Sequence, residues 1–221
     1  MFYIRAVSDV IWNGFLAVIP VGLAYLIARF IRREEPTRRA AWRRYLLVGL
    51  LGVLWLFFLP NTCYLLTEWR HYLNALSHSD IISRTLNARD NHAIVTLCAY
   101  SLAFLLYSLF GLFTFALGIR PIARLLRARM AHYWVLGIPF FPLMSLGVYL
   151  GLIHRFNSWD LLMAPGKIFR EGAQAVLRPY TGMYILLFGL FLWGGNYLFD
   201  IWIDGFHARC AALRRLSRSD Q

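Results

Sequence analysis

Two short polar clusters in an otherwise apolar chain contain the side chains that could do chemistry. Residues 59–71 read Leu-Pro-Asn-Thr-Cys-Tyr-Leu-Leu-Thr-Glu-Trp-Arg-His, and residues 147–160 read Gly-Val-Tyr-Leu-Gly-Leu-Ile-His-Arg-Phe-Asn-Ser-Trp-Asp. Each cluster combines carboxylate with imidazole, the groups used for general acid–base catalysis and as ligands for zinc or iron. Each cluster also contains an arginine, and the guanidinium of Arg155 in the second cluster could recognise carboxylates and phosphates. The residue types therefore allow an acid–base centre, a metal site or a site for an anionic ligand.

The candidate polar site draws on both clusters. Arg155 would donate hydrogen bonds together with asparagine and tyrosine side chains, and Glu68 and Asp160 would orient these donors. A simpler alternative remains for the end of the second cluster, because Asn157 followed three residues later by Asp160 resembles a helix capping box. No metal is assigned and no cofactor is indicated. The candidate residues are Asn61, Tyr64, Thr67, Glu68, His71, His154, Arg155, Asn157 and Asp160.

A secondary acidic pair occurs near the C-terminus. Asp200 and Asp204 are four residues apart, so on a helix they share one face, with His207 a further turn along. Carboxylates within a membrane span are expensive and face partners or water. The pair therefore forms ion pairs with arginines of the first or third loop, or it serves as a proton or ion relay.

The composition of the chain indicates which secondary-structure elements position these residues. The chain has 221 residues, of which 59% are hydrophobic and 15% charged, and its mean hydropathy is +0.53. A soluble domain is about 25% charged, and about 20 consecutive apolar residues cross a bilayer as a helix. We therefore predict an all-α polytopic integral membrane protein with one membrane domain over residues 1–221 and no separate soluble domain. The five expected spans are 10–31, 45–66, 93–117, 132–153 and 182–203.

Short helices are expected between the spans. After Pro165, apolar and charged residues alternate with helical spacing, which is typical of an amphipathic helix in the membrane interface. Residues 74–87 show a weaker version of this pattern, and residues 119–130 are expected to extend the third span as a basic surface helix. The cysteines Cys63, Cys98 and Cys210 lie far apart and form neither a disulfide framework nor a metal pair.

Orientation follows from the basic residues between the spans. The first loop, the third loop and the C-terminal tail together hold fourteen arginines, whereas the other side holds eight Arg and Lys residues. This bias predicts an outward N-terminus and a cytoplasmic C-terminus. It also accounts for the net charge of +12 through contact with anionic lipid headgroups rather than nucleic acid. In this topology, both polar clusters lie at the outer face.

The two polar clusters resemble the signature blocks of the bacterial membrane proteins grouped as domain-of-unknown-function family 1361. The resemblance extends over most of the chain through the span pattern, and it differs from the family at Cys63, Leu152 and Phe156, where proline, arginine and tryptophan are expected. It implies a multi-pass protein of the bacterial inner membrane and no established biochemical activity. The matching positions are Pro60, Asn61, Tyr64, Thr67, Glu68, Gly147, Tyr149, Gly151, Arg155, Asn157, Ser158, Trp159 and Asp160.

Three functions are compatible with these residues. The leading hypothesis is a non-enzymatic, outward-facing polar pocket that binds an anionic lipid, a cell-envelope intermediate or a membrane-protein partner. The first alternative is a membrane-embedded hydrolase or transferase, with Glu68 or Asp160 as base and His71 or His154 as acid or metal ligand. The second is a small proton-coupled transporter that uses Asp200 and Asp204.

Overall fold

Long helices dominate the computed structural model, which describes residues 2–33, 37–67, 69–86, 90–154, 156 and 163–219, without the side chains at 2–9, 70, 71, 75 and 217–219. Five helices are long and apolar enough to cross a membrane, and shorter helices connect them. This confirms the predicted all-α, multi-span fold. The helices are α1 (Phe2–Arg32), α2 (Arg38–Thr67), α3 (Trp69–Ser77), α4 (Ile81–Leu86), α5 (Asn91–Arg127), the 3-10 turn η1 (Tyr133–Leu136), α6 (Gly137–His154), α8 (Pro165–Leu177) and α9 (Pro179–Ser219).

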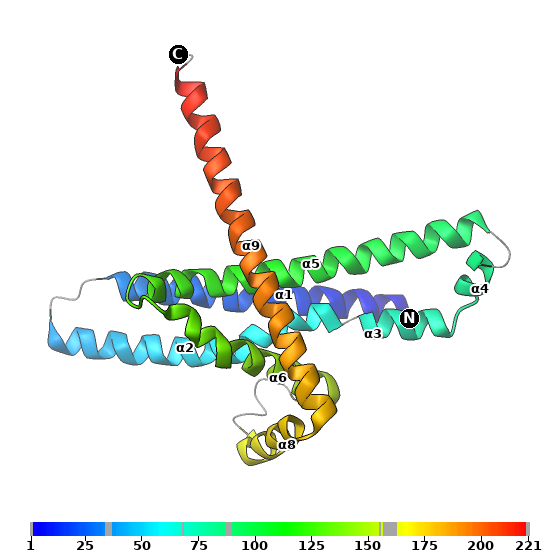
Figure 1. Cartoon of the computed structure of the whole chain (residues 1–221), viewed down its shortest axis with the longest axis horizontal. Helices are drawn as coiled ribbons and strands as arrows, with labels where there is room; N and C mark the ends of the chain where they lie inside the picture. Colours follow the sequence, from blue (N-terminus) through cyan, green and yellow to red (C-terminus); the bar gives the residue numbers. More distant parts are fainter. Residues whose placement is uncertain are drawn as a thin grey trace.

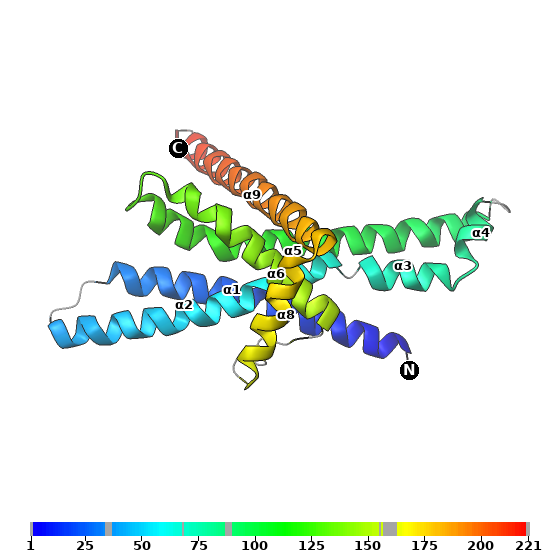
Figure 2. The same cartoon turned by 60° about the horizontal axis from the view of Figure 1, so that its bottom comes forward.

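The long helices form two packed groups. Helices α1, α2 and α5 pack against one another along the long axis of the molecule, and α6 packs against α9 (Figure 1). Contacts between α2 and α6 and between α5 and α9 join the groups. Helix α9 crosses α5 steeply, and its C-terminal half projects away from the other helices in Figure 1, whereas in the turned view of Figure 2 it lies along the upper edge of the molecule.

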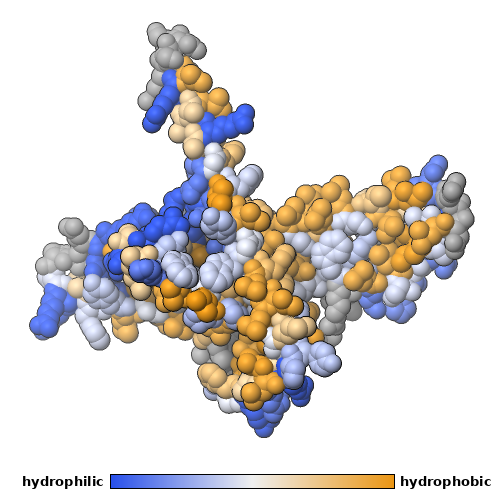
Figure 3. Space-filling model, in the orientation of Figure 1, coloured by the Kyte–Doolittle hydropathy of each residue, from blue (hydrophilic) through white to orange (hydrophobic). Residues whose placement is uncertain are grey.

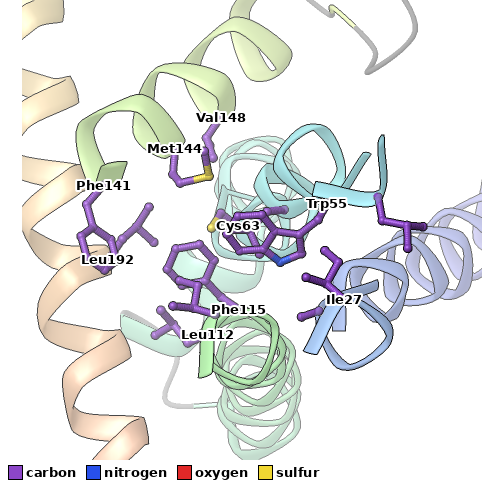
Figure 4. Close-up of a cluster of buried hydrophobic side chains, with 13 residues drawn as sticks. Ile27, Trp55, Cys63, Leu112, Phe115, Phe141, Met144, Val148 and Leu192 are labelled. Carbon is purple, nitrogen blue, oxygen red and sulfur yellow. The ribbon is translucent and has the colours of Figure 1, made fainter. Parts of the chain in front are cut away.

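One buried hydrophobic cluster receives side chains from all five long helices (Figure 4). Helix α1 contributes Ile27, α2 contributes Trp55 and Cys63, and α5 contributes Phe115. Helices α6 and α9 complete it with residues such as Met144 and Leu192. The two groups of helices therefore share one core, which fixes α6 beside α2.

Close contacts lock α5 onto α2. The buried Trp55 indole donates a hydrogen bond of 2.9 Å to the Gly118 carbonyl. At Gly111, a Cβ atom would lie 2.7 Å from the Thr62 carbonyl oxygen and 2.8 Å from the Leu65 Cβ. Only glycine permits this approach of two backbones.

Hydrophobic side chains also cover much of the outer surface. Figure 3 shows them over α5 and along α9, and exposed examples include Ile11, Leu106 and Leu187. Exposed apolar residues on helices of this length are the expected contact with lipid. The expected short helices also form: α8 follows Pro165, and α3 and α4 cover most of 74–87.

The basic extension of the third span differs from the prediction in one respect. Helix α5 does continue through Arg127, but residues 118–121 are buried and do not form a surface helix. The physical reason is that α9 crosses α5 at this level and supplies carboxylates for Arg120.

Candidate functional site

A groove of about 700 Å³ lies between α2, α6 and α8. Both sequence clusters contribute to it, since Pro60, Asn61 and Tyr64 come from the first and Gly147, Gly151 and Phe156 from the second. Its volume is in the range of small-ligand sites, about 300–1,000 Å³. The other lining residues are Leu56, Phe57, Leu143, Met144, Leu146, Leu150, Ile168, Phe169, Gly172, Ala173, Val176 and Leu177.

Two glycines of α6 set the distance to α2. A Cβ atom at Gly147 would lie 3.0 Å from the Pro60 ring, and one at Gly151 would overlap the hydroxyl and ring of Tyr64. The Tyr64 hydroxyl donates a long hydrogen bond of 3.4 Å to the Gly147 carbonyl. Gly147 and Gly151, four residues apart, therefore act as a small-residue pair that allows α6 to approach α2 closely. Tyr64 is thereby held against the backbone of α6.

Helix α8 forms the third wall. Pro165 occupies its first turn, where a missing backbone N–H costs nothing. Its apolar side chains, among them Ile168 and Val176, line the groove. On its exposed side, the Lys167 ammonium lies 5.3 Å from the centre of the Phe156 ring, a cation–π contact. Phe156 also lines the groove, so Lys167 brings a positive charge to its edge.

The structure places only part of the candidate polar site. Asn61 and Tyr64 line the groove, whereas the Thr67 hydroxyl donates to the Tyr64 carbonyl within α2, at 2.9 Å. The exposed His154 ring stacks on Phe156, with ring centres 5.6 Å apart. The remaining candidates, or their side chains, lie outside the described residues: Glu68, His71, Arg155, Asn157 and Asp160.

The described part of the groove lining is mostly apolar, whereas five of the nine expected polar residues, or their side chains, lie outside the described residues. The reason is that α6 presents glycines and leucines to the groove and α8 turns its apolar face inward. Among the described residues, no group of His, Cys, Asp and Glu side chains could hold a metal ion. The arrangement suits a hydrocarbon chain with a polar group at one end.

The secondary acidic pair contacts α5. Arg120, buried in α5, pairs with the carboxylates of Asp200 and Asp204 and also donates to the Asp200 carbonyl at 3.0 Å. The more exposed Arg124 shares Asp204 at 3.0 Å. The carboxylates thus contact arginines that the sequence assigned to the third loop. Because one guanidinium joins two turns of α9, this cluster fixes the crossing of α5 and α9.

The family described as protein of unknown function (DUF1361) matches residues 12–194, which is most of the chain. The chain belongs to the DUF1361 family. The DUF1361 match includes the whole groove and Arg120, but it ends before Asp200. No curated protein and no solved structure matches the chain.

Sequence reasoning missed two parts of this DUF1361 structure. The sequence does not indicate that α8 lines a groove with α2 and α6, and part of its apolar face, including Phe169 and Val176, stays exposed. The sequence places Arg120 in the basic extension of the third span, because the apolar segment ends near residue 117. Its distance of 80 residues from Asp200 left no local signal for the ion pair.

Proposed function

We propose that the chain binds an anionic amphiphile, either a lipid or a lipid-linked envelope intermediate, with its hydrocarbon chain in the groove between α2, α6 and α8. The observation that supports this most is the apolar lining at the point where both sequence clusters converge. Burial of hydrocarbon contributes about 0.8 kcal/mol for each CH₂ group. The groove therefore favours an extended chain over a small polar substrate.

Polar groups near the groove would bind the negatively charged head group of such an amphiphile. Lys167 contacts Phe156 at the groove, and Asn61 and Tyr64 supply donors from α2. Near a membrane surface, each basic residue adds about 1 kcal/mol of attraction to anionic lipid. We further propose that Arg155, the neighbour of Phe156 in sequence, adds a second cation for this head.

The proposal includes a location and an orientation. We place the protein in a bacterial inner membrane with its N-terminus outward and its C-terminus in the cytoplasm, on the basis of the basic bias of the first and third loops. The groove would then open toward the outer leaflet, where a lipid-linked envelope intermediate is encountered.

The groove can be tested by filling it. Ala173 lines the groove and is exposed, whereas its neighbour Gln174 is exposed outside it. In nanodiscs of phosphatidylcholine and phosphatidylglycerol, we expect Ala173→Trp to reduce crosslinking of a phosphatidylglycerol with a diazirine on its acyl chain by about tenfold, equivalent to ~1.4 kcal/mol. The matched control Gln174→Trp should crosslink like the wild type. Equal crosslinking in both variants would contradict binding in the groove.

Recognition of the anionic head group is tested by removing a positive charge from α8. Lys167→Gln should weaken the preference for phosphatidylglycerol over phosphatidylcholine about fivefold. Arg170→Gln is the control, because Arg170 is exposed and lies 3.9 Å from the Glu171 carboxylate instead of contacting Phe156. If the two variants behave alike, Lys167 has no special role in recognising the head.

A further inference from the structure

The C-terminal part of α9, residues 205–219, is strongly basic and extends beyond the ion pairs that hold α9 to α5. We call it the distal segment. Helix α9 is held to α5 as far as Asp204, where Arg120 and Arg124 bind the carboxylate. At the next residue, Gly205, a Cβ atom would meet no other atom within 4 Å. Beyond this point, α9 projects away from the other helices (Figure 1).

The length of α9 places the distal segment outside the hydrocarbon core. Its 41 residues rise about 60 Å, whereas the hydrocarbon core is about 30 Å thick. The expected span of 182–203 fills that core, so the residues after Gly205 reach the membrane surface. The segment also lies beyond the end of the family match at residue 194.

The distal segment is amphipathic. Phe206, Cys210 and Leu213 share one face at helical spacing, and Phe206 and Leu213 are 58% exposed. This face continues the exposed Trp202 of the membrane span. Arg209, Arg214 and Arg215 are exposed and flank this face or lie opposite it. Residues 205–219 contain a fourth arginine, Arg218, and no Asp or Glu. Figure 3 shows hydrophobic and hydrophilic residues side by side on this part of the helix.

We infer that the distal segment lies on the surface of an anionic membrane, with Phe206, Cys210 and Leu213 facing the acyl chains. The excess of arginine selects this occupant over a second copy of the chain, since two such basic segments repel each other. A bend at Gly205 toward the lipid-facing side of α9 turns the apolar face to the bilayer. Glycine weakens the helix at that residue, and no packed neighbour opposes the bend.

The native Cys210 allows a direct depth measurement in the full chain. Cys98 is exposed and is replaced by serine, whereas Cys63 is buried and is kept. In the Cys98→Ser variant, bimane is attached to Cys210. In Cys98→Ser/Cys210→Ser/Ala211→Cys, it is attached to the new cysteine at residue 211. The variant Cys98→Ser/Cys210→Ser, which lacks both sites, measures residual labelling. Each protein is placed in nanodiscs of phosphatidylcholine alone or of equal parts phosphatidylcholine and phosphatidylglycerol.

With anionic lipid, we expect brominated lipid to quench the probe at Cys210 and aqueous iodide to quench the probe at residue 211. In phosphatidylcholine alone, the difference in quenching between the two probe positions should shrink. In anionic nanodiscs, each single substitution Arg209→Gln, Arg214→Gln or Arg215→Gln should weaken the association of the distal segment with the membrane about fivefold. Equal iodide quenching of both positions in anionic nanodiscs would overturn the inference. Protection of Cys210 from both quenchers would also overturn it, because protein would then cover the face.

Discussion

At the scale of single residues, glycines decide how close the helices come. Gly111 brings α5 against the backbone of α2, and no side-chain rotation can relieve a Cβ atom 2.7 Å from the Thr62 carbonyl oxygen. We expect Gly111→Ala to destabilise the fold by about 1–3 kcal/mol through overpacking. Denaturation with sodium dodecyl sulfate, followed by tryptophan fluorescence, measures this change.

The control for Gly111 is a glycine on α2 with open space around it. A Cβ atom at Gly52 would meet nothing within 4 Å, so Gly52→Ala should stabilise the helix by about 0.5–1 kcal/mol. A loss of stability at Gly52 as large as that at Gly111 would mean that helix contacts do not explain the effect.

The carboxyl of Asp90 makes the stability of the start of α5 depend on pH. Its side chain accepts hydrogen bonds from Arg84 and from the backbone N–H groups of His92 and Ala93, and these contacts hold the pKa of its carboxyl below the ordinary value of 3.8. A carboxyl with a lowered folded pKa stabilises the fold above its unfolded pKa, and this stabilisation is lost as the pH falls through the folded pKa. The start of α5 should therefore loosen only in acid.

Hydrogen exchange at the first turn of α5 tests this cap. At neutral pH, we expect Asp90→Asn to raise the exchange rate relative to the wild type, because the N-cap contacts and the pairing with Arg84 weaken. The ratio of the two rates should fall toward one as the pH drops below 3.8. Asp80→Asn, in the preceding exposed connection, should show no such dependence. A ratio that is constant with pH would argue against this role of Asp90.

At the scale of elements, two arginines that differ in burial hold α5 and α9 where they cross. The Arg120 side chain is 4% exposed and the Arg124 side chain 54% exposed, yet both contact Asp204. Because Asp200 and Asp204 are partly exposed, we expect Arg120→Ala to cost about 2–3 kcal/mol, below the ~3–5 kcal/mol for breaking a fully buried pair. Arg124→Ala should cost under ~1 kcal/mol, as at a surface. Equal losses of unfolding free energy in the two variants would contradict this difference.

Hydropathy predicted the elements themselves well, since five apolar segments became five long helices. It could not predict which helices cross. The contact between Arg120 and Asp200 joins residues 80 positions apart, and the sequence carries no local mark of it. The groove was predictable in part, because glycines four residues apart, as at 147 and 151, are typical of a close helix contact. The inward turn of α8 was not, because an apolar helical face packs equally well on lipid and on protein.

At the scale of the whole molecule, the predicted topology can be tested by thiol labelling. Exposed positions at Arg39, Ser77 and Gln174 report the first, second and fourth connections. In intact cells and with Cys98→Ser/Cys210→Ser as background, we expect an impermeant maleimide to label Ser77→Cys and Gln174→Cys but not Arg39→Cys. Gly172 is a poor reporter, because it is buried between α8 and α6. Opposite labelling of Ser77→Cys and Gln174→Cys would separate the two polar clusters and refute the shared outer site.

The buried Arg120 also has a consequence for the order of biogenesis. Its partners on α9 lie 80 and 84 residues later in the chain, so α5 is synthesised several seconds before they exist at roughly 5–20 residues per second. Until then, the guanidinium needs water, lipid phosphate or an insertion factor. Arrival of α9 removes that need, which makes the last helix the step that completes assembly. A chain that ends before Asp200 would leave the Arg120 guanidinium without these two carboxylate partners.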